Sequence, residues 1–273
     1  MNIPIHVGIP SYNNAIDLKR LLGELSQQKF ASITVLDDAS TDDTQSMLSS
    51  FPDVKCIRSE VNLGTVGANN LMLRNMPESG FILFIDSDMM LETKNIPEAL
   101  SLFISQHPNI GAGVGKIINQ KGEATRWNYN YDLNPLRSLF AFLTYHPAVI
   151  FKNVPGLGAF LRIKSLLFTM HLADDDPKKI DWGIEAFFFV RVDLFKDLQG
   201  FDSRFKRFHE GPDLFLQIRK RGFETWFTPS IVARDIDQHT GTTWERRYHW
   251  WRSYIIYFWK NPSRLLMYRV PRP

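Results

Sequence analysis

Strand-like and helix-like segments alternate along residues 1–120, and this alternation constrains the fold more than any other feature of the sequence. Short apolar runs predict buried strands, and the longer segments between them carry apolar residues at helical spacing. The predicted strands are 5–9, 32–36, 54–59, 81–85 and 110–118, and the predicted helices are 15–28, 42–50, 67–75 and 96–106. Strands that alternate with helices form a parallel sheet with crossover helices on its faces. The sequence therefore predicts an α/β domain.

Two aspartates, Asp86 and Asp88, directly follow the strand predicted at residues 81–85. In a doubly wound sheet, the loops after the carboxyl ends of the strands form the crevice that binds ligands. Carboxylate oxygens at this place suit Mg²⁺ or Mn²⁺ that carries a diphosphate. An isolated Asp-Ser-Asp triplet is more often a helix cap or a solvated turn, but its position after a buried strand favours a metal site.

Polar residues also follow the first two predicted strands. Pro10 and Tyr12 follow the first strand, and Asp37 and Asp38 follow the second. Since these strand ends meet at one edge of the sheet, an aspartate there can hold a ribose or a base while Tyr12 lines the base pocket. We assign Asp38 to the nucleotide. The alternative is that the polar side chains of this loop only cap the next helix.

A third group of polar and small residues, Asn62, Gly64 and Asn69, follows the strand predicted at 54–59. Glycine there lets the backbone approach a ligand, or opens a helix whose free N–H groups favour phosphate. The glycine-rich run at residues 111–116 lacks the spacing and the Ser or Thr of a phosphate-binding loop. Because this run lies within a strand pattern, it indicates close packing between strands.

Composition excludes several other classes of protein. The 273 residues are 44% hydrophobic, which suffices for the core of one large domain. The single cysteine, Cys56, cannot form an internal disulfide and fits a reducing compartment. Residues 1–6 do not begin a signal-peptide pattern, and no segment reaches the roughly 18 apolar residues that a membrane span needs. We therefore expect a cytoplasmic protein.

Seven motifs, in order along the chain, resemble those of the inverting glycosyltransferases of family 2, which have the GT-A fold. They lie at residues 9–13, 36–42, 62–64 with 69–70, 86–88, 200–202, 210–214 and 239–243. Within the family, the chain resembles the rhamnosyltransferase-like bacterial enzymes that build surface polysaccharides. The resemblance implies a Rossmann-like, mostly parallel sheet flanked by helices.

We expect the GT-A domain to cover residues 1–243. Its nucleotide-binding half would be residues 1–120 and its acceptor-side half residues 121–243, with an irregular insertion at 127–180. In the second half, regular patterning resumes at residues 186–192 and continues at 193–198. It then predicts a helix at 212–221 and a last strand at 225–227, which resumes near residue 231. Residues 244–273 would form a C-terminal extension.

The resemblance implies transfer of a sugar from a UDP- or dTDP-sugar to a hydroxyl of a glycan or a lipid-linked acceptor. In the family pattern, Asp38 contacts the uracil or thymine, Asp86 lies on the ribose side, and Asp88 binds the divalent metal ion, Mn²⁺ or Mg²⁺. His239 would join the metal ion or the diphosphate, and neutral imidazole suits Mn²⁺ better than Mg²⁺. A carboxylate would take the acceptor proton as general base.

The chain departs from its family at the position of this base. The family usually has Asp where this chain has Gly211, and it usually has glycine where this chain has Glu185. One carboxylate is thus lost and another gained in the same region. Our hypothesis is that Glu185 or Glu210 supplies the base, with Asp213 as a further candidate in the same motif. The alternative is that Pro212 only starts the helix, that Asp213 only stabilises its first turn, and that catalysis is feeble or absent.

The segment 244–273 is basic and aromatic. It holds seven Arg and Lys and one Glu, a net charge of +6, which leaves −3 for residues 1–243. Apolar residues recur there at helical spacing, at Trp244, Tyr248, Trp251, Ile255 and Phe258. Such a stripe predicts a helix docked on the catalytic domain. Trp, Tyr and Arg also suit an anionic membrane surface, where the protein would be peripheral at the inner face, or a nucleic acid acceptor.

Two other functions compete with glycosyl transfer. A sugar nucleotidyltransferase also uses metal-binding carboxylates, but it should carry a Gly-rich N-terminal loop with Arg and Lys, where residues 8–20 offer Pro, Tyr and Asn instead. A protein that kept the fold after losing its base would bind a nucleotide or a glycan without turning it over.

Overall fold

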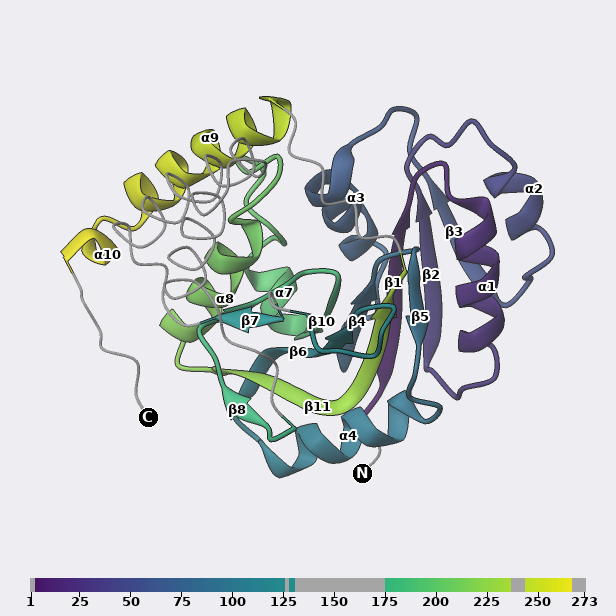
Figure 1. Ribbon diagram of the computed structural model, residues 1–273, viewed down its shortest axis with the longest axis horizontal. Helices are drawn as coiled ribbons and strands as arrows, with labels where there is room; N and C mark the ends of the chain where they lie inside the picture. Colours follow the sequence, from purple (N-terminus) through teal and green to yellow (C-terminus); the bar gives the residue numbers. More distant parts are fainter. Residues whose placement is uncertain (1–2, 126–127, 131–174, 237–243, 267–273) are drawn as a thin grey trace, which may run out of the picture.

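The computed structural model describes residues 3–125, 128–130, 175–236 and 244–266, and nine of its described strands form one sheet flanked by helices (Figure 1). The sheet order is β3-β2-β1-β4-β10-β6-β11-β5, and β8 also pairs with β11. The strands of this sheet are β1 Ile5–Ser11, β2 Ser32–Asp37, β3 Val54–Arg58, β4 Phe81–Ile85, β5 Met89–Leu91, β6 Ile110–Ile118, β8 Lys178–Lys179, β10 Phe187–Arg191 and β11 Glu224–Asp235. Two short strands, β7 Tyr129–Asn130 and β9 Trp182–Gly183, pair with each other.

The described helices cover both faces of this sheet. They are α1 Ala15–Leu25, α2 Thr44–Leu48, α3 Gly64–Leu73, α4 Ile96–Gln106, α7 Val192–Asp197, α8 Glu210–Lys220, α9 Trp244–Lys260 and α10 Ser263–Leu266. Apolar side chains of α1, α2 and α4 pack in one core cluster, and those of α3, α7 and α8 pack in a second. Because the central strands are covered on both faces, β4 is buried along its whole length, which explains its uninterrupted apolar sequence.

Strand direction brings distant parts of the chain to one edge of the sheet. β3, β2, β1 and β4 are all parallel, β10 runs antiparallel between β4 and β6, and β6 is parallel to β11. Since β10 is antiparallel to β4, it begins where β4 ends, and the N–H of Asp86 donates to the carbonyl of Ala186 at 3.0 Å. The residues that precede β10 therefore lie beside the acidic triplet 86–88.

The glycine-rich run at 111–116 is part of β6, and the prediction of close strand packing is confirmed. A Cβ at Gly113 would lie 2.5 Å from the carbonyl oxygen of Trp226 and would overlap the ring of Phe189. A Cβ at Gly115 would overlap the ring of Phe187. These glycines leave room for the phenylalanine side chains of β10, so the run is structural.

The predicted elements of residues 1–120 are all present, and the differences lie at their ends. α3 begins at Gly64 rather than at 67, and α8 begins at Glu210 rather than at 212. The last strand, predicted in two pieces, is the single strand β11 with a register shift between Thr228 and Val232. β5 and the short strands β7, β8 and β9 were not predicted. Most of the insertion expected at 127–180 lies outside the described residues.

The C-terminal helix α9 docks as predicted, but the prediction of its docking face was wrong. Among the side chains of α9 that the structure describes, Ser253, Tyr257 and Phe258 are buried. Tyr257 and Phe258 belong to a small core cluster with Phe205 of the preceding loop. Of the predicted stripe only Phe258 is buried, whereas Trp244, Tyr248 and Ile255 are 80%, 64% and 62% exposed, as is Trp259 at 78%. The polar residues Ser253 and Lys260 on the buried face decide how α9 is oriented. The spacing of apolar residues alone does not reveal their role. No helix in the described part of the chain is long and apolar enough to cross a bilayer.

Candidate active site

The carboxyl ends of β1, β2 and β4 meet at one edge of the sheet, and hydrogen bonds join the loops that follow them. Asn13 Oδ1 accepts from the N–H of Thr41 at 2.7 Å, and Asn14 Nδ2 donates to Ser87 Oγ at 3.0 Å. Asn13 and Ala39 both hold a left-handed backbone, with φ of 50° and 62°. Backbone strain of this kind clusters at functional sites, and here it lies where a ligand crevice is expected.

Asp38 is buried, and its carboxylate organises the start of α3. Its Oδ1 accepts from Ser59 Oγ at 2.9 Å and from the N–H of Leu63 at 2.8 Å, and its Oδ2 accepts from the N–H of Gly64 at 2.9 Å. Negative charge is favourable at a helix N-terminus. Asp38 therefore fixes the loop that also carries Asn62, whose Oδ1 accepts from the same N–H of Gly64 at 3.0 Å. Its contact with a nucleotide base stays a prediction.

The other residues predicted for the donor lie around this loop. Asp37 is fully buried, and its carboxylate accepts a hydrogen bond from the guanidinium of Arg58. Pro10 is half-buried at the end of β1, whereas Tyr12 is 50% exposed and open to a ligand. Asn69 of α3 is 2% exposed, and its Oδ1 finds no hydrogen-bond partner among the described residues.

Asp86, Asp88 and Asp235 form the acidic centre of this edge. β11 brings Asp235 there because it pairs antiparallel with β5, which places Asp235 opposite Met89. Burial, together with the negative charges of Asp88 and Asp235, raises the pKa of Asp86 to about 7. A cation would relieve this repulsion, so the acidic centre fits a divalent metal ion. Among the described residues, no three His, Cys, Asp or Glu side chains are arranged to hold a metal ion on their own.

Glu185 and Glu210 form a second acidic pair beside this centre. Glu185 lies in the turn before β10, next to Ala186, and Glu210 opens α8. Burial raises the pKa of Glu185 to about 8, with the charges of Glu210 and Asp86 acting in the same direction, and burial raises the pKa of Glu210 to about 7. Interacting carboxylates of this kind titrate as a pair. Near neutral pH the pair can therefore accept a proton.

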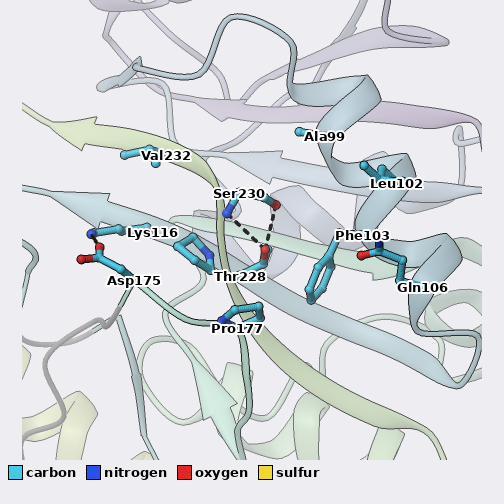
Figure 2. Close-up of a pocket in the computed structure, with 11 residues that line it drawn as sticks. Ala99, Leu102, Phe103, Gln106, Lys116, Asp175, Pro177, Thr228, Ser230 and Val232 are labelled. Atoms are coloured by element: carbon cyan, nitrogen blue, oxygen red, sulfur yellow. Dashed lines mark hydrogen bonds and ion pairs between the residues drawn. The ribbon is translucent and has the colours of Figure 1, made fainter.

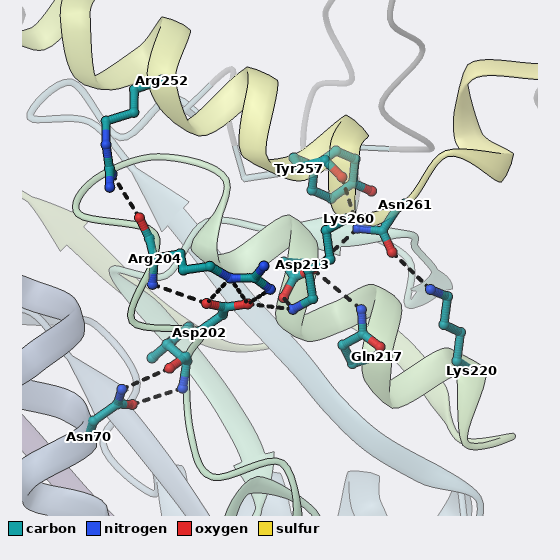
Figure 3. A network of polar contacts seen from close by, with 11 residues as sticks. Asn70, Asp202, Arg204, Asp213, Gln217, Lys220, Arg252, Tyr257, Lys260 and Asn261 are labelled. Atoms are coloured by element: carbon teal, nitrogen blue, oxygen red, sulfur yellow. Dashed lines mark hydrogen bonds and ion pairs between the residues drawn. The ribbon is translucent and has the colours of Figure 1, made fainter.

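Asp213, the third predicted catalytic carboxylate, is held by the C-terminal helix (Figure 3). Its Oδ2 accepts from Lys260 Nζ at 2.6 Å, and its Oδ1 accepts from Asn261 Nδ2 at 3.3 Å. Lys260 Nζ also donates to Asp202 Oδ2 at 2.7 Å. Because Asp213 is 2% exposed and both its oxygens are bound inside the protein, these contacts indicate that it joins α8 to α9 rather than meeting a substrate.

His239, the predicted partner of Asp88, lies outside the described residues. Three residues at the site were not predicted: Asn14, Arg58 and Asp235. Asp235 ends the last strand of the sheet, so the signal that identified Asp86, a carboxylate at a strand end, could have found it. Arg58 is a charged residue at the end of a short strand, which gives no comparable signal.

A separate pocket of about 500 Å³ lies between α4 and the bend of β11 (Figure 2). Phe103 and Gln106 line it from α4, and Thr228 Oγ1 and Ser230 Oγ meet there at 2.7 Å. None of the residues predicted for the donor, the metal ion or the base lines this pocket. The candidate active site is therefore the edge of the sheet where the predicted residues meet, and not this pocket.

Comparison with known sequences identifies the family of the chain. The sequence model of Glycosyl transferase family 2 matches residues 6–198, which include the strand ends and the acidic triplet. The chain belongs to glycosyl transferase family 2. The family predicted from the seven motifs is thereby confirmed.

Two relatives of this family 2 chain show how far the similarity reaches. The N-acetylglucosaminyl-diphospho-decaprenol L-rhamnosyltransferase of Mycobacterium tuberculosis is 23% identical over 271 residues, which cover 89% of this chain and 85% of that protein. The poly(ribitol-phosphate) beta-N-acetylglucosaminyltransferase TarS of Staphylococcus aureus is 26% identical over 121 residues, which cover 42% of this chain. The chain spans 21% of the length of TarS.

Solved structures show the fold of this family 2 chain. The mannosyltransferase PcManGT of Pyrobaculum calidifontis, in complex with GDP-Man and Mn²⁺, has a TM-score of 0.56 at 16% identity, over 88% of this chain and 59% of that one. TarS 1-349 of S. aureus in complex with UDP has a TM-score of 0.55 at 17% identity, over 94% of this chain and 65% of that one. The prediction of a GT-A α/β fold is confirmed.

Proposed function

We propose that this chain transfers a sugar from a UDP- or dTDP-sugar to an acceptor hydroxyl, with inversion at the anomeric carbon and with the help of a divalent metal ion. The observation that carries this proposal is the placement of Asp86 and Asp88 beside the carboxyl ends of β1 and β2. The names of similar proteins support it, since they include an L-rhamnosyltransferase, a complex with GDP-Man and Mn²⁺, and a complex with UDP.

On the donor side, each residue has a proposed task. The exposed ring of Tyr12 stacks on the base, while the loop fixed by Asp38 closes the base pocket. Asp86 lies toward the ribose. Asp88 would hold Mn²⁺ or Mg²⁺ together with His239, and the metal ion, when bound, neutralises the departing diphosphate.

On the acceptor side, we propose that an anionic membrane surface presents a lipid-linked glycan. The exposed apolar face of α9 carries Trp244, Tyr248, Ile255 and Trp259. Arg252 of the same helix donates to the carbonyl of Arg204 at 2.7 Å, so the loop that carries the exposed residues Arg204, Lys206 and Arg207 lies beside α9. Aromatic side chains next to Arg and Lys suit the interface of an anionic bilayer. The loop leads into Glu210, which would bring the acceptor close to the acidic pair.

A screen of nucleotide sugars tests the proposed donor. UDP- and dTDP-sugars should raise the melting temperature of the protein in the presence of Mn²⁺, and the effect should vanish with EDTA. Asp88→Asn should abolish the metal-dependent part of the shift because it removes a ligand charge. Glu98→Gln, an exposed charge change on α4, serves as the control. No stabilisation by any nucleotide sugar, with either metal ion, would refute the proposal.

A further inference from the structure

We infer that Glu185, from the turn before β10, supplies the general base, and that Gly211 of α8 is the positioning residue that admits its carboxylate. This inference rests on the proposed transfer function and chooses between the two candidate carboxylates. The reacting carboxylate would then come from the turn before β10 and not from α8.

The carboxylate of Glu185 occupies the space that a side chain at position 211 would need. A Cβ built on Gly211 would overlap both Oε1 and Cδ of Glu185 and would lie 2.8 Å from its Cγ. The backbone N–H of Gly211 lies close enough to this carboxylate to lower its pKa, against the larger effect of burial. Gly211 has no left-handed backbone to explain its identity, since it is absent from the positive-φ glycines of the described chain. Glycine at position 211 therefore leaves free the space that the Glu185 carboxylate occupies.

Accessibility separates Glu185 from Glu210. Glu210 is 7% exposed, and its Oε2 is buried without a hydrogen-bond partner among the described residues. Glu185 is only half-buried. A general base must come within hydrogen-bond reach of the proton that it removes, and we assign this role to the more exposed residue of the pair, Glu185.

The backbone also ties Glu185 to the donor side of the site. Its neighbour Ala186 accepts the hydrogen bond from the N–H of Asp86 at 3.0 Å. Asp86 is close enough for its charge to raise the pKa of Glu185. The base and the acidic centre are therefore held together by β4 and β10, whereas Glu210 follows the loop 203–209.

The proposed reaction is a single displacement at the anomeric carbon. The Glu185 carboxylate takes the proton of the acceptor hydroxyl while the acceptor oxygen forms a bond to the anomeric carbon. The bond from the anomeric carbon to the diphosphate oxygen breaks, and the nucleoside diphosphate leaves with the electron pair. Attack from the face opposite to the leaving group inverts the anomeric configuration.

Three single variants test the assignment, with transfer from the donor found in the screen as the readout. Glu185→Gln should lower kcat by about 100-fold or more, the usual contribution of a general base, while calorimetric binding of UDP with Mn²⁺ stays unchanged. Gly211→Ala should lower kcat in the same way because its Cβ displaces the carboxylate. Gly23→Ala on α1 is the matched control, since a Cβ there meets nothing within 4 Å, and it should retain wild-type activity.

A reciprocal exchange gives the sharpest test. Glu185→Gly combined with Gly211→Asp places a carboxylate back into the same space from α8. The kcat of this double variant should be at least tenfold higher than the kcat of Glu185→Gly alone. Wild-type kcat in Glu185→Gln, or no recovery in the exchange variant, would overturn this inference and leave the transfer function standing. A wild-type protein that binds UDP but turns over no donor would overturn the transfer function itself.

Discussion

Residues with left-handed backbones lie on both sides of the proposed active site. Asn13 and Ala39 hold this conformation on the donor side, and Phe208 and His209, with φ of 67° and 64°, hold it directly before Glu210. The ring of His209 packs edge-on against Trp250 of α9 with 5.4 Å between ring centroids. Burial lowers the pKa of His209 to about 3, so the ring stays neutral and packs as an aromatic group. The strained turn is thus held by packing against α9.

The acidic pair predicts the pH dependence of the reaction. Because the base must be ionised, kcat/KM should rise with pH, with an apparent pKa between about 7 and 8. Burial raises the pKa of Glu210 to about 7, and burial together with the charge of Glu210 raises the pKa of Glu185 to about 8. Glu210→Gln should move this midpoint to lower pH, since it removes a negative charge that raises the pKa of Glu185. A pH profile of both proteins checks this. A midpoint that does not move would contradict the coupling of the two carboxylates.

At the scale of elements, α9 is joined to α8 by charge and by packing. Lys260 lies between Asp202 and Asp213, and Lys220 Nζ donates to Asn261 Oδ1 at 2.8 Å (Figure 3). The guanidinium of Arg204, together with Lys260, holds the pKa of Asp202 well below its usual range. This network anchors the helix whose first turn carries Glu210 and Gly211, so the position of the acidic pair depends on α9.

Removing the bridging charge should loosen this attachment. Lys260→Met removes the cation that Asp202 and Asp213 share, which leaves Asp202 with Arg204 and leaves Asp213 without this ion pair. We expect the free energy of unfolding to fall by about 3 kcal/mol. Urea denaturation of the wild-type protein and the variant measures this loss of unfolding free energy. Lys179→Met is the control: it removes an ion pair with Glu224 from a side chain that is 62% exposed, so it should cost less than about 1 kcal/mol. Equal losses in the two variants would argue against a structural role for the network.

At the scale of the whole molecule, the sequence predicts local order better than the meeting of distant segments. The apolar runs identify β1, β2 and β4 because parallel strands buried on both faces need such runs. A carboxylate at a strand end could have marked Asp235 as a candidate, but its place beside Asp86 depends on an antiparallel partner, β5, that spans only residues 89–91 and was not predicted. The contact of Glu185 with Gly211 joins two elements across the sheet edge, and no local pattern encodes it.

The docking face of α9 escaped prediction for a related reason. Trp and Tyr occur on both faces of this helix, so apolar spacing does not separate the buried face from the exposed one. Ser253, which donates to the carbonyl of Arg207 at 2.8 Å, and Lys260 decide which face docks. Trp244, Tyr248 and Ile255 of the predicted stripe consequently face outward, where the proposal places a membrane.

Vesicle flotation tests this outward face. The protein should float with vesicles of phosphatidylglycerol and phosphatidylcholine at low salt, and less at high salt, because the screening length shortens from about 10 Å at 0.1 M to about 3 Å at 1 M. Ile255→Asp combined with Trp259→Asp should abolish flotation. Leu102→Asp, an equally exposed site on α4 at 61%, should leave it intact. Absence of binding to anionic vesicles at low salt would reject a membrane partner.

The central claim is inverting, metal-dependent transfer at the edge where β1, β2 and β4 end, and the configuration of the released sugar tests it most directly. Proton NMR of the first product formed from a UDP- or dTDP-sugar with Mn²⁺, recorded before mutarotation, distinguishes the two anomers. We predict the anomer opposite to that of the donor, and no product when EDTA is present or when Asp88 is replaced by Asn. A product with the configuration of the donor, or product formation that is independent of metal, would contradict the account.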